Sequence, residues 1–165
     1  MRVGIAGYGL AGRYFHAPLL KGCGYEVVAI QTSNADRAGH ALEDFPNAEV
    51  VATIEELVAH KLDLVVVASA NLVHAEHAFA AINAGIPVVI DKPMGRTFAE
   101  TAEIISAGER AGVPVSTFFN RRWDSDALTI KKVLASGVLG TIHRMDSRFE
   151  RFRPELNKSS WRENM

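Results

Sequence analysis

The feature that most constrains the fold is an aliphatic run, Leu64 to Ala68, in which polar and apolar residues do not alternate. Such a run is typical of a strand that is buried on both faces of a sheet. Short aliphatic segments and helical patterns alternate around it over the first 120 residues. Repeated strand–helix–strand units of this kind predict a parallel sheet with helices on both faces, which is an α/β, doubly wound fold.

The individual elements follow from the apolar runs and from the helical spacing between them. The expected strands are Arg2–Gly7, Glu26–Gln31, Glu49–Val51, Leu64–Ala68, Val88–Ile90 and Val113–Phe118. The expected helices cover residues 10–20, 35–42, 54–60, 72–84 and 97–111. Asn71 and Thr97 are expected to cap helix N-termini, and Gly85 and Gly112 to end helices in the left-handed conformation.

The charge balance changes near residue 120. Residues 1–120 contain 8 Lys and Arg against 13 Asp and Glu, a net charge of −5, whereas residues 121–165 contain 10 against 6, a net charge of +4. A shift of this kind is typical of a domain boundary. We therefore expect a dinucleotide-binding domain over residues 1–120 and the start of a second, incomplete α+β domain over residues 121–165.

The second segment has its own pattern. A helix is expected over Ser125–Ala135, with Asp124 as its cap, followed by an alternating strand over Thr141–Phe149. A single strand is not independently stable. We expect exposed apolar surface around Met145 and Phe149, with association or disorder as the result.

Composition excludes several classes of protein. The chain is 48% hydrophobic and 22% charged, with a net charge of −1, so no global field favours nucleic acid or an anionic membrane. No apolar run approaches the roughly 18 residues of a membrane span, and no leader pattern opens the chain. The single cysteine, Cys23, fits a reducing compartment, and we expect a cytoplasmic protein. No metal site is predicted.

A glycine-rich turn directly follows the first expected strand. Its sequence is Gly7-Tyr8-Gly9-Leu10-Ala11-Gly12, which matches the GxGxxG pattern. Gly7 would allow the tight turn, Gly9 the close approach of a pyrophosphate, and Gly12 the packing of helix on strand. The backbone N–H groups at that helix N-terminus, those of Leu10 and Ala11 among them, would face the phosphates. The alternative is a turn that serves tight packing alone.

The end of the second strand indicates which dinucleotide is bound. An Asp or Glu there would favour NAD, but this chain has Gln31-Thr32-Ser33-Asn34, with Arg37 one turn into the next helix. Thr32, Ser33 and the Arg37 guanidinium suit a 2′-phosphate, which favours NADP. Two alternatives stay open: these residues merely start a helix, or Asp36 turns inward and favours NAD.

Two further strand ends should border the same site. Ser69-Ala70-Asn71 follows the fourth strand, and Asp91-Lys92-Pro93 follows the fifth. The Lys92 ammonium, positioned by Asp91, would orient a substrate hydroxyl, stabilise alkoxide charge or assist proton transfer beside a nicotinamide. The alternative is an ordinary surface Asp–Lys pair in a turn.

The histidines suggest no metal centre. His74 and His77 lie three residues apart on one helix, but no third ligand has convincing spacing. Packing at the helix start or a cofactor contact is the expected role of His74. We expect His16 to be structural, and His40 and His60 to be solvated.

Three further motifs accompany the glycine-rich turn and Asp91-Lys92-Pro93: the basic phrase Phe119-Asn120-Arg121-Arg122-Trp123-Asp124-Ser125-Asp126, the segment Phe149–Pro154, and Trp161-Arg162-Glu163. Together these motifs resemble the glucose–fructose oxidoreductase/inositol dehydrogenase (Gfo/Idh/MocA) family over essentially the whole chain. The family's tripeptide is usually Glu-Lys-Pro, and the Asp variant with the phrase at residues 119–126 resembles the NADP-dependent scyllo-inositol dehydrogenase subgroup.

The resemblance implies a Rossmann NAD(P)-binding domain and a reversible hydride transfer between NADP, with NAD as the alternative, and a secondary alcohol of a polyol, inositol or sugar. It implies that Lys92 lies at the nicotinamide, that the Lys92–Pro93 bond is cis, and that Pro93, Asn120 and Arg121 border the cofactor. Trp161 and Arg162 would approach the cofactor from the second domain.

Relatives run to about twice this length, and the remainder carries a catalytic histidine and most substrate contacts. The resemblance therefore implies a form with little activity by itself and a homo-oligomer in the full-length form. A non-catalytic dinucleotide sensor is the main alternative, which Lys92 argues against. A methyltransferase is less consistent with Asp-Lys-Pro, and no DNA-reading helix is present.

Overall fold

The computed structural model describes residues 1–150, 152, 154 and 155. The chain divides into two units, Met1–Asn120 and Arg121–Met165. The first unit contains a six-stranded, wholly parallel sheet in the order β3-β2-β1-β4-β5-β6. The doubly wound α/β fold expected from the sequence is confirmed.

The strands match the apolar runs closely. They are β1 Arg2–Ala6, β2 Glu26–Gln31, β3 Glu49–Val51, β4 Leu64–Val67, β5 Val88–Asp91 and β6 Val115–Phe118. The helices between them are α1 Ala17–Gly22, α2 Ala35–Asp44, α3 Ile54–Val58, α4 His74–Asn83 and α5 Phe98–Ala111. Short turns of other helix types are η1 Gly12–His16, η2 Asn71–Val73 and η3 Asn120–Trp123.

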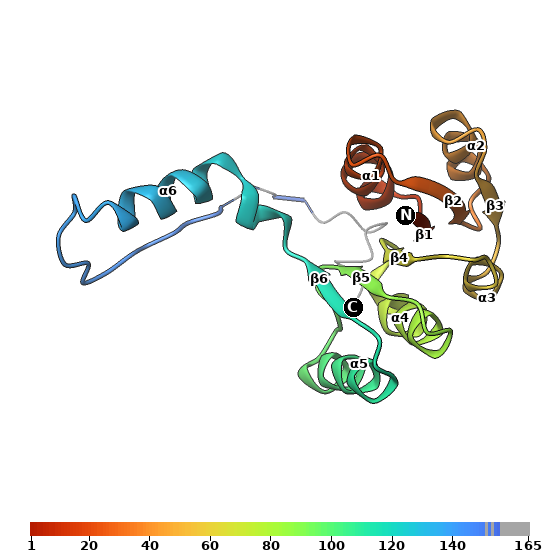
Figure 1. Ribbon diagram of the computed structural model, residues 1–165. Coiled ribbons are helices and arrows are strands. Elements are labelled where there is room, and N and C mark those ends of the chain that lie inside the picture. The colour runs from red at the N-terminus through yellow and green to blue at the C-terminus, as the bar shows by residue number, and fades with distance from the viewer. Residues whose placement is uncertain (151, 153, 156–165) are drawn as a thin grey trace. The chain divides into compact units, whose positions relative to one another are not determined.

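Helices cover both faces of the sheet (Figure 1). Ala17 and Leu20 of α1 and Ala41 of α2 belong to one apolar core, whereas Leu57 of α3, Ile82 of α4 and Ile104 of α5 belong to the other. Strand β4 supplies both, because Val65 and Val67 face one core and Val66 faces the other. The prediction of a strand buried on both faces is confirmed, and each such valine contributes about 1.5–3 kcal/mol.

Local signals place most helix ends. The Thr97 hydroxyl accepts a hydrogen bond from the Glu100 N–H at 3.1 Å, so Thr97 caps α5 as expected. Gly85 and Gly112 have positive φ values of 72° and 65°, as their positions after helices require. Asn71 does not cap: it opens the turn η2, and α4 begins only at His74.

The first helix departs from the sequence prediction. Its first turn, η1, is π-helical, with the N–H of Ala17 bonded to the carbonyl of Gly12, and α1 continues from there. One additional residue in this turn changes which side chains face the sheet. It buries His16, whose ring lies 4.3 Å from that of Phe118 on β6.

The second unit contains η3 and the helix α6, Ser125–Ala135. Asp124 stands at the expected cap position, but its side chain accepts from Arg121 at 2.9 Å and makes no cap bond. The predicted strand over residues 141–149 is wrong, since residues 141–150 form neither helix nor strand. Alternation needs a neighbouring strand to bond to, and residues 121–150 supply none. Met145 and Phe149 are exposed, as expected.

In the described part of the chain, no helix is both long enough and apolar enough to cross a membrane.

Candidate functional site

The strand order reverses between β1 and β4, because the chain proceeds outward from β1 to β3 and then returns to β4. In open α/β sheets, ligands bind outside the carboxyl ends of the strands at this point. The turns that follow β1, β2, β4 and β5 all lie at this edge, since every strand pair is parallel. The edge therefore defines the candidate site.

The three glycines of the first turn have different surroundings. Gly7 has a φ of +96°, and a β-carbon there would lie 2.5 Å from the Cα of Ser69. A β-carbon on Gly12 would collide with the carbonyl oxygen of Gly7. On Gly9 it would meet only the guanidinium of Arg37, at 3.6 Å. Gly7 and Gly12 are thus required by packing, whereas Gly9 keeps the approach to the turn open.

The turn also offers hydrogen-bond donors. The N–H of Arg13 bonds to the carbonyl of Gly9 at 2.9 Å, so the amides of Leu10, Ala11 and Gly12 precede the first bond within the helix. Leu10 is 68% exposed. Free amides at a helix start carry partial positive charge and bind anions such as phosphate.

A partly buried network, which the sequence analysis missed, holds the glycine-rich turn against the end of α2. Asp44, at the end of α2, accepts from the Tyr8 hydroxyl at 2.8 Å and from the Arg13 guanidinium at 2.9 Å. Burial, and then the bond to Asp44, raise the pKa of Tyr8 well above its ordinary range, so its hydroxyl stays a donor. No local sequence signal connects Tyr8 with a carboxylate 36 residues later.

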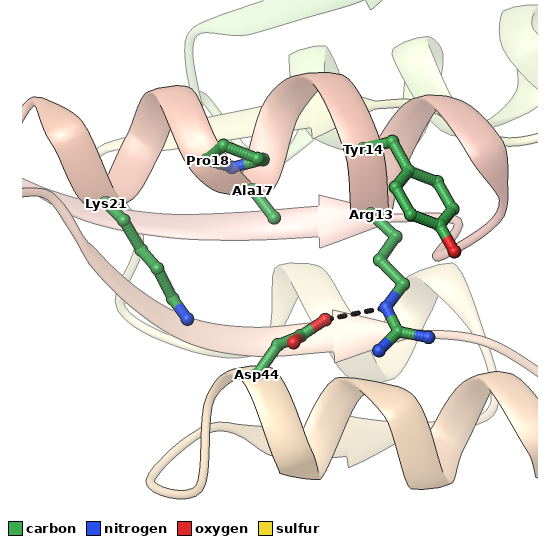
Figure 2. A pocket seen from close by; sticks show the side chains of 6 residues that line it. All are labelled: Arg13, Tyr14, Ala17, Pro18, Lys21 and Asp44. Carbon is green, nitrogen blue, oxygen red and sulfur yellow. Dashed lines mark hydrogen bonds and ion pairs between the residues drawn. The ribbon is translucent and has the colours of Figure 1, made fainter.

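Arg13 and Asp44 also line a pocket together with Tyr14, Ala17, Pro18 and Lys21 (Figure 2). The Arg13 guanidinium is already paired there, with Asp44 at 2.9 Å and with Glu43 at 3.6 Å. The Lys21 ammonium lies 4.5 Å from the centre of the Phe45 ring. These charges stabilise the packing of α1 against α2.

The turn after β2 places Arg37 at the glycines. Asn34 caps α2 by accepting from the Arg37 N–H at 3.0 Å, while the Arg37 side chain reaches back to Gly9. The guanidinium has no hydrogen bond or ion pair to any residue that the structure describes. Ser33 is exposed, whereas Thr32 is 9% exposed and its hydroxyl accepts from the Asn34 N–H. Thr32 therefore shapes the turn.

The turns after β4 and β5 form the other half of the edge. The Ser69 hydroxyl is buried and has no hydrogen-bond partner in the described part of the chain. Asn71 is partly buried and lies two residues further on. Asp91 accepts from the Lys92 N–H at 2.8 Å, and the Lys92–Pro93 bond is cis, as the resemblance implied. The Lys92 side chain is exposed.

The expectation that His74 contacts a cofactor needs correction. Its ring is 1% exposed, and both nitrogens lie against backbone carbonyls, Nδ1 at 2.8 Å from Pro93 and Nε2 at 3.1 Å from Ser69. Packing at the helix start, the other expectation for this residue, agrees with the structure. A ring that is enclosed and bonded on both sides has no free atom for a ligand.

The other histidines separate into buried and exposed rings. Burial lowers the pKa of His16 and of His77, and the nearby carboxylates Asp91 and Glu76, respectively, partly oppose that shift. His16 is 4% exposed, in line with a structural role. His40 is exposed as expected, and His60 is half-buried and lies 3.7 Å from the Glu49 carboxylate.

The remaining expected contacts come after β6 in the sequence. Asn120 belongs to η3 and is partly buried. Arg121, in the second unit, pairs with Asp124 at 2.9 Å and lies 4.9 Å from the Phe149 ring centre. Trp161 and Arg162 fall outside the described residues.

The residues at the edge fit a dinucleotide. Gly9 keeps the approach to the free helical amides open, the Arg37 guanidinium lies next to that glycine, and the buried Ser69 hydroxyl has no hydrogen-bond partner among the described residues. Amides and a guanidinium are the donors that phosphates prefer in proteins.

Comparison with known proteins agrees with this arrangement. The oxidoreductase family with an NAD-binding Rossmann fold, Gfo/Idh/MocA, matches residues 1–119. Scyllo-inositol 2-dehydrogenase (NADP(+)) of Bacillus subtilis is 42% identical over 99% of this chain and 45% of its own length. An uncharacterized oxidoreductase of Escherichia coli is 41% identical, with 99% of this chain and 46% of its own length covered.

Solved structures give the same result. A protein from Yersinia pestis is 38% identical and superposes with a TM-score of 0.88, over 99% of this chain and 46% of its own. One from Klebsiella pneumoniae is 39% identical with a TM-score of 0.86, over 93% and 44%. The chain spans slightly less than half the length of these relatives. It belongs to the Gfo/Idh/MocA oxidoreductase family, whose Rossmann fold its first unit adopts.

Proposed function

We propose that the carboxyl edge of the sheet binds NADP and that the protein transfers hydride between NADP and a secondary alcohol. The observation that carries the proposal is the Arg37 guanidinium at 3.6 Å from the β-carbon position of Gly9, without another partner in the described structure. A cation directly above a phosphate-binding turn favours a dinucleotide that carries one more phosphate.

The turns after β1 and β2 would bind the phosphates of the dinucleotide. The amides of Gly9, Leu10, Ala11 and Gly12 would donate to the pyrophosphate, because none has a partner within the helix. Ser33 and Arg37 would bind the 2′-phosphate of the adenosine ribose. Gln31 stands where a carboxylate would favour NAD, and its amide donates to the Ala52 carbonyl at 2.9 Å, which supports the preference for NADP.

The turns after β4 and β5 would bind the nicotinamide. Ser69 offers an unpartnered hydroxyl, and Asn71, Asp91, Lys92 and Pro93 surround the same strand ends. A bound nicotinamide would supply the hydride donor or acceptor at this position. In the direction of alcohol formation, the Lys92 ammonium, exposed at the end of β5, would donate a hydrogen bond to the carbonyl oxygen and stabilise the negative charge that develops there as hydride adds to the carbonyl carbon.

A polyol is the proposed substrate class. The Bacillus subtilis relative is named for scyllo-inositol, and a relative from Saccharopolyspora erythraea, 35% identical over 143 residues, is named inositol 2-dehydrogenase. Both names describe oxidation of a ring hydroxyl. An inositol or a related sugar is therefore the first candidate.

Nucleotide titration followed by a hydride-transfer assay tests the proposal. The purified chain is expected to bind NADPH more tightly than NADH, measured by nicotinamide fluorescence. Reduction of NADP by inositols, other polyols and sugars is then followed, and any activity is expected to disappear in Lys92→Met. The proposal is overturned if neither nucleotide binds, or if Lys92→Met keeps full activity.

A further inference from the structure

His74 links two of the turns that form the candidate site. It is the first residue of α4, and its ring lies between the carbonyl of Ser69, which follows β4, and the carbonyl of Pro93, which follows β5. The distances are 3.1 Å from Nε2 to Ser69 and 2.8 Å from Nδ1 to Pro93. One buried side chain thus joins both strand ends that would hold the nicotinamide.

The chemistry of the two contacts determines the state of the ring. A carbonyl oxygen only accepts hydrogen bonds, so each nitrogen must carry a proton to bond with it. A neutral imidazole carries one N–H, whereas the imidazolium carries two. With both contacts at hydrogen-bond distance, the ring satisfies both carbonyls only as the cation.

The loop after Lys92 is held at further points. The Glu100 carboxylate accepts from the Arg96 N–H at 2.5 Å, and a β-carbon on Gly95 would lie 2.9 Å from the nitrogen of Thr101. These contacts fasten residues 95 and 96 to the start of α5. Pro93, directly beside Lys92, is fastened by His74. The contact from His74 to Pro93 therefore bears on Lys92, in addition to the hydrogen bond from the Lys92 N–H to Asp91.

Two titratable groups interact with charge on His74 in opposite ways, since the Glu100 carboxylate attracts a cation and the His77 ring, when protonated, repels one. Hydrogen bonding to Arg96 is the main cause that lowers the pKa of Glu100, and positive charge on His74 acts in the same direction. Burial is the main cause that lowers the pKa of His77, to which a charged His74 also contributes. Glu100 from α5 and His77 from α4 are thus two titratable groups close enough to this ring to interact with its charge.

We propose that His74 is a positioning residue which, as a buried imidazolium, clamps the Ser69 and Pro93 carbonyls and thereby sets Lys92 against the nicotinamide half of the cofactor. The effect of His74 on cofactor binding rests on the proposed function. The protonation and the two hydrogen bonds can be tested without it. His74 contacts neither substrate nor cofactor itself.

Nitrogen-15 NMR of the histidine rings tests the clamp directly in the unaltered chain. The His74 resonances, assigned by their loss in His74→Gln, are expected to show protons on both ring nitrogens at neutral pH. The resonances of exposed His40, assigned by their loss in His40→Gln, serve as the reference for a ring in water. A single protonated nitrogen on His74 would overturn the proposal.

Binding measurements test whether His74 affects the affinity for NADPH. His74→Phe removes both bonds and is expected to weaken NADPH binding about tenfold. His74→Gln, which keeps a donor, should fall between His74→Phe and the unaltered chain. Adenosine 2′,5′-bisphosphate, which lacks the nicotinamide, should bind all three equally, and His40→Gln should change neither ligand.

The outcomes separate the two proposals. Equal weakening of NADPH and of the bisphosphate in His74→Phe would mean a general structural role and would overturn the positioning role. Failure of the unaltered chain to bind either ligand would overturn the proposed function, while the NMR result would still decide the state of the ring. If His74→Phe does not fold, His74→Gln and the NMR measurement decide.

Discussion

The guanidinium of Arg37 lies 3.6 Å from the place where a β-carbon on Gly9 would stand. Gly9 and Arg37 are 28 positions apart in the sequence. The turn after β1 and the start of α2 therefore meet at one point of the sheet edge. The contact depends on Asn34, which caps α2 and so sets where the helix starts. It also depends on Asp44, which ties the far end of α2 to Tyr8 within the glycine-rich turn.

Replacement of Arg37 by alanine should reduce the preference for NADPH. The variant removes the cation above the turn and no bond within the described fold, so NADPH affinity is expected to fall by about ten- to a hundredfold, with NADH affinity nearly unchanged. Calorimetric titration of both nucleotides provides the measurement. Arg110→Ala, which removes an exposed pair with Glu103, is the matched control. Equal loss of both nucleotides would contradict the role of Arg37.

Two glycine variants should separate folding from binding. Gly9→Ala meets only the flexible Arg37 side chain, so the free energy of unfolding should change little while NADPH binding is lost. Gly7→Ala places a methyl group against the Ser69 backbone at a φ of +96° and should destabilise the fold by several kcal/mol. Chemical denaturation and nucleotide titration of each variant distinguish the two effects.

Gly39→Ala, in the middle of α2 with nothing nearby, is the control for the glycine variants and should stabilise by up to about 1 kcal/mol. Normal NADPH binding by Gly9→Ala would show that the space above this glycine is not used by a ligand.

The Tyr8–Asp44 bond should contribute to stability. Tyr8→Phe keeps the buried ring but leaves Asp44 with one donor fewer, at an expected cost of about 1–2 kcal/mol in the free energy of unfolding. Tyr25→Phe, at a partly exposed tyrosine, is the control and should stay within about 0.5 kcal/mol. Denaturant unfolding of the two variants is the check, and equal effects would show that the bond does not stabilise the fold.

Stability should decline in acid through two buried histidines. Burial lowers the pKa of His16 and of His77 below their ordinary value of 6.5, so the unfolded chain binds protons at a pH where the folded chain does not. The free energy of unfolding should therefore be highest above about pH 6.5 and fall below it, by up to about 1.4 kcal/mol per pH unit for each ring.

His16→Phe and His77→Phe should each flatten this dependence, whereas exposed His40→Phe should not. Unfolding by urea at a series of pH values measures the slope. A slope that none of the variants changes would assign the acid sensitivity to other groups.

The first unit was largely predictable from the sequence because its signals are local. Unbroken apolar runs mark strands such as β4, and Thr97 and Gly112 mark the two ends of α5. The strand proposed for residues 141–149 failed because alternation shows only which side chains would share a face. Whether a strand forms depends on a bonding partner elsewhere.

The candidate site was predictable only in part. The glycine-rich turn and the position of Lys92 follow from short motifs at strand ends. The Tyr8–Asp44–Arg13 network and the contacts of His74 with Ser69 and Pro93 join residues from separate elements, so no local pattern reports them. The π-helical turn brings His16 against Phe118 of β6, which is likewise a contact between separate elements.

Titration of NADPH into the nitrogen-15-labelled chain, followed at the backbone amides, shows whether the glycine-rich turn binds the dinucleotide. Saturable shifts are expected at the amides of Leu10, Ala11 and Gly12, and near Arg37, at lower concentrations of NADPH than of NADH. Absence of any shift in the glycine-rich turn at saturating concentrations of either nucleotide would contradict binding there.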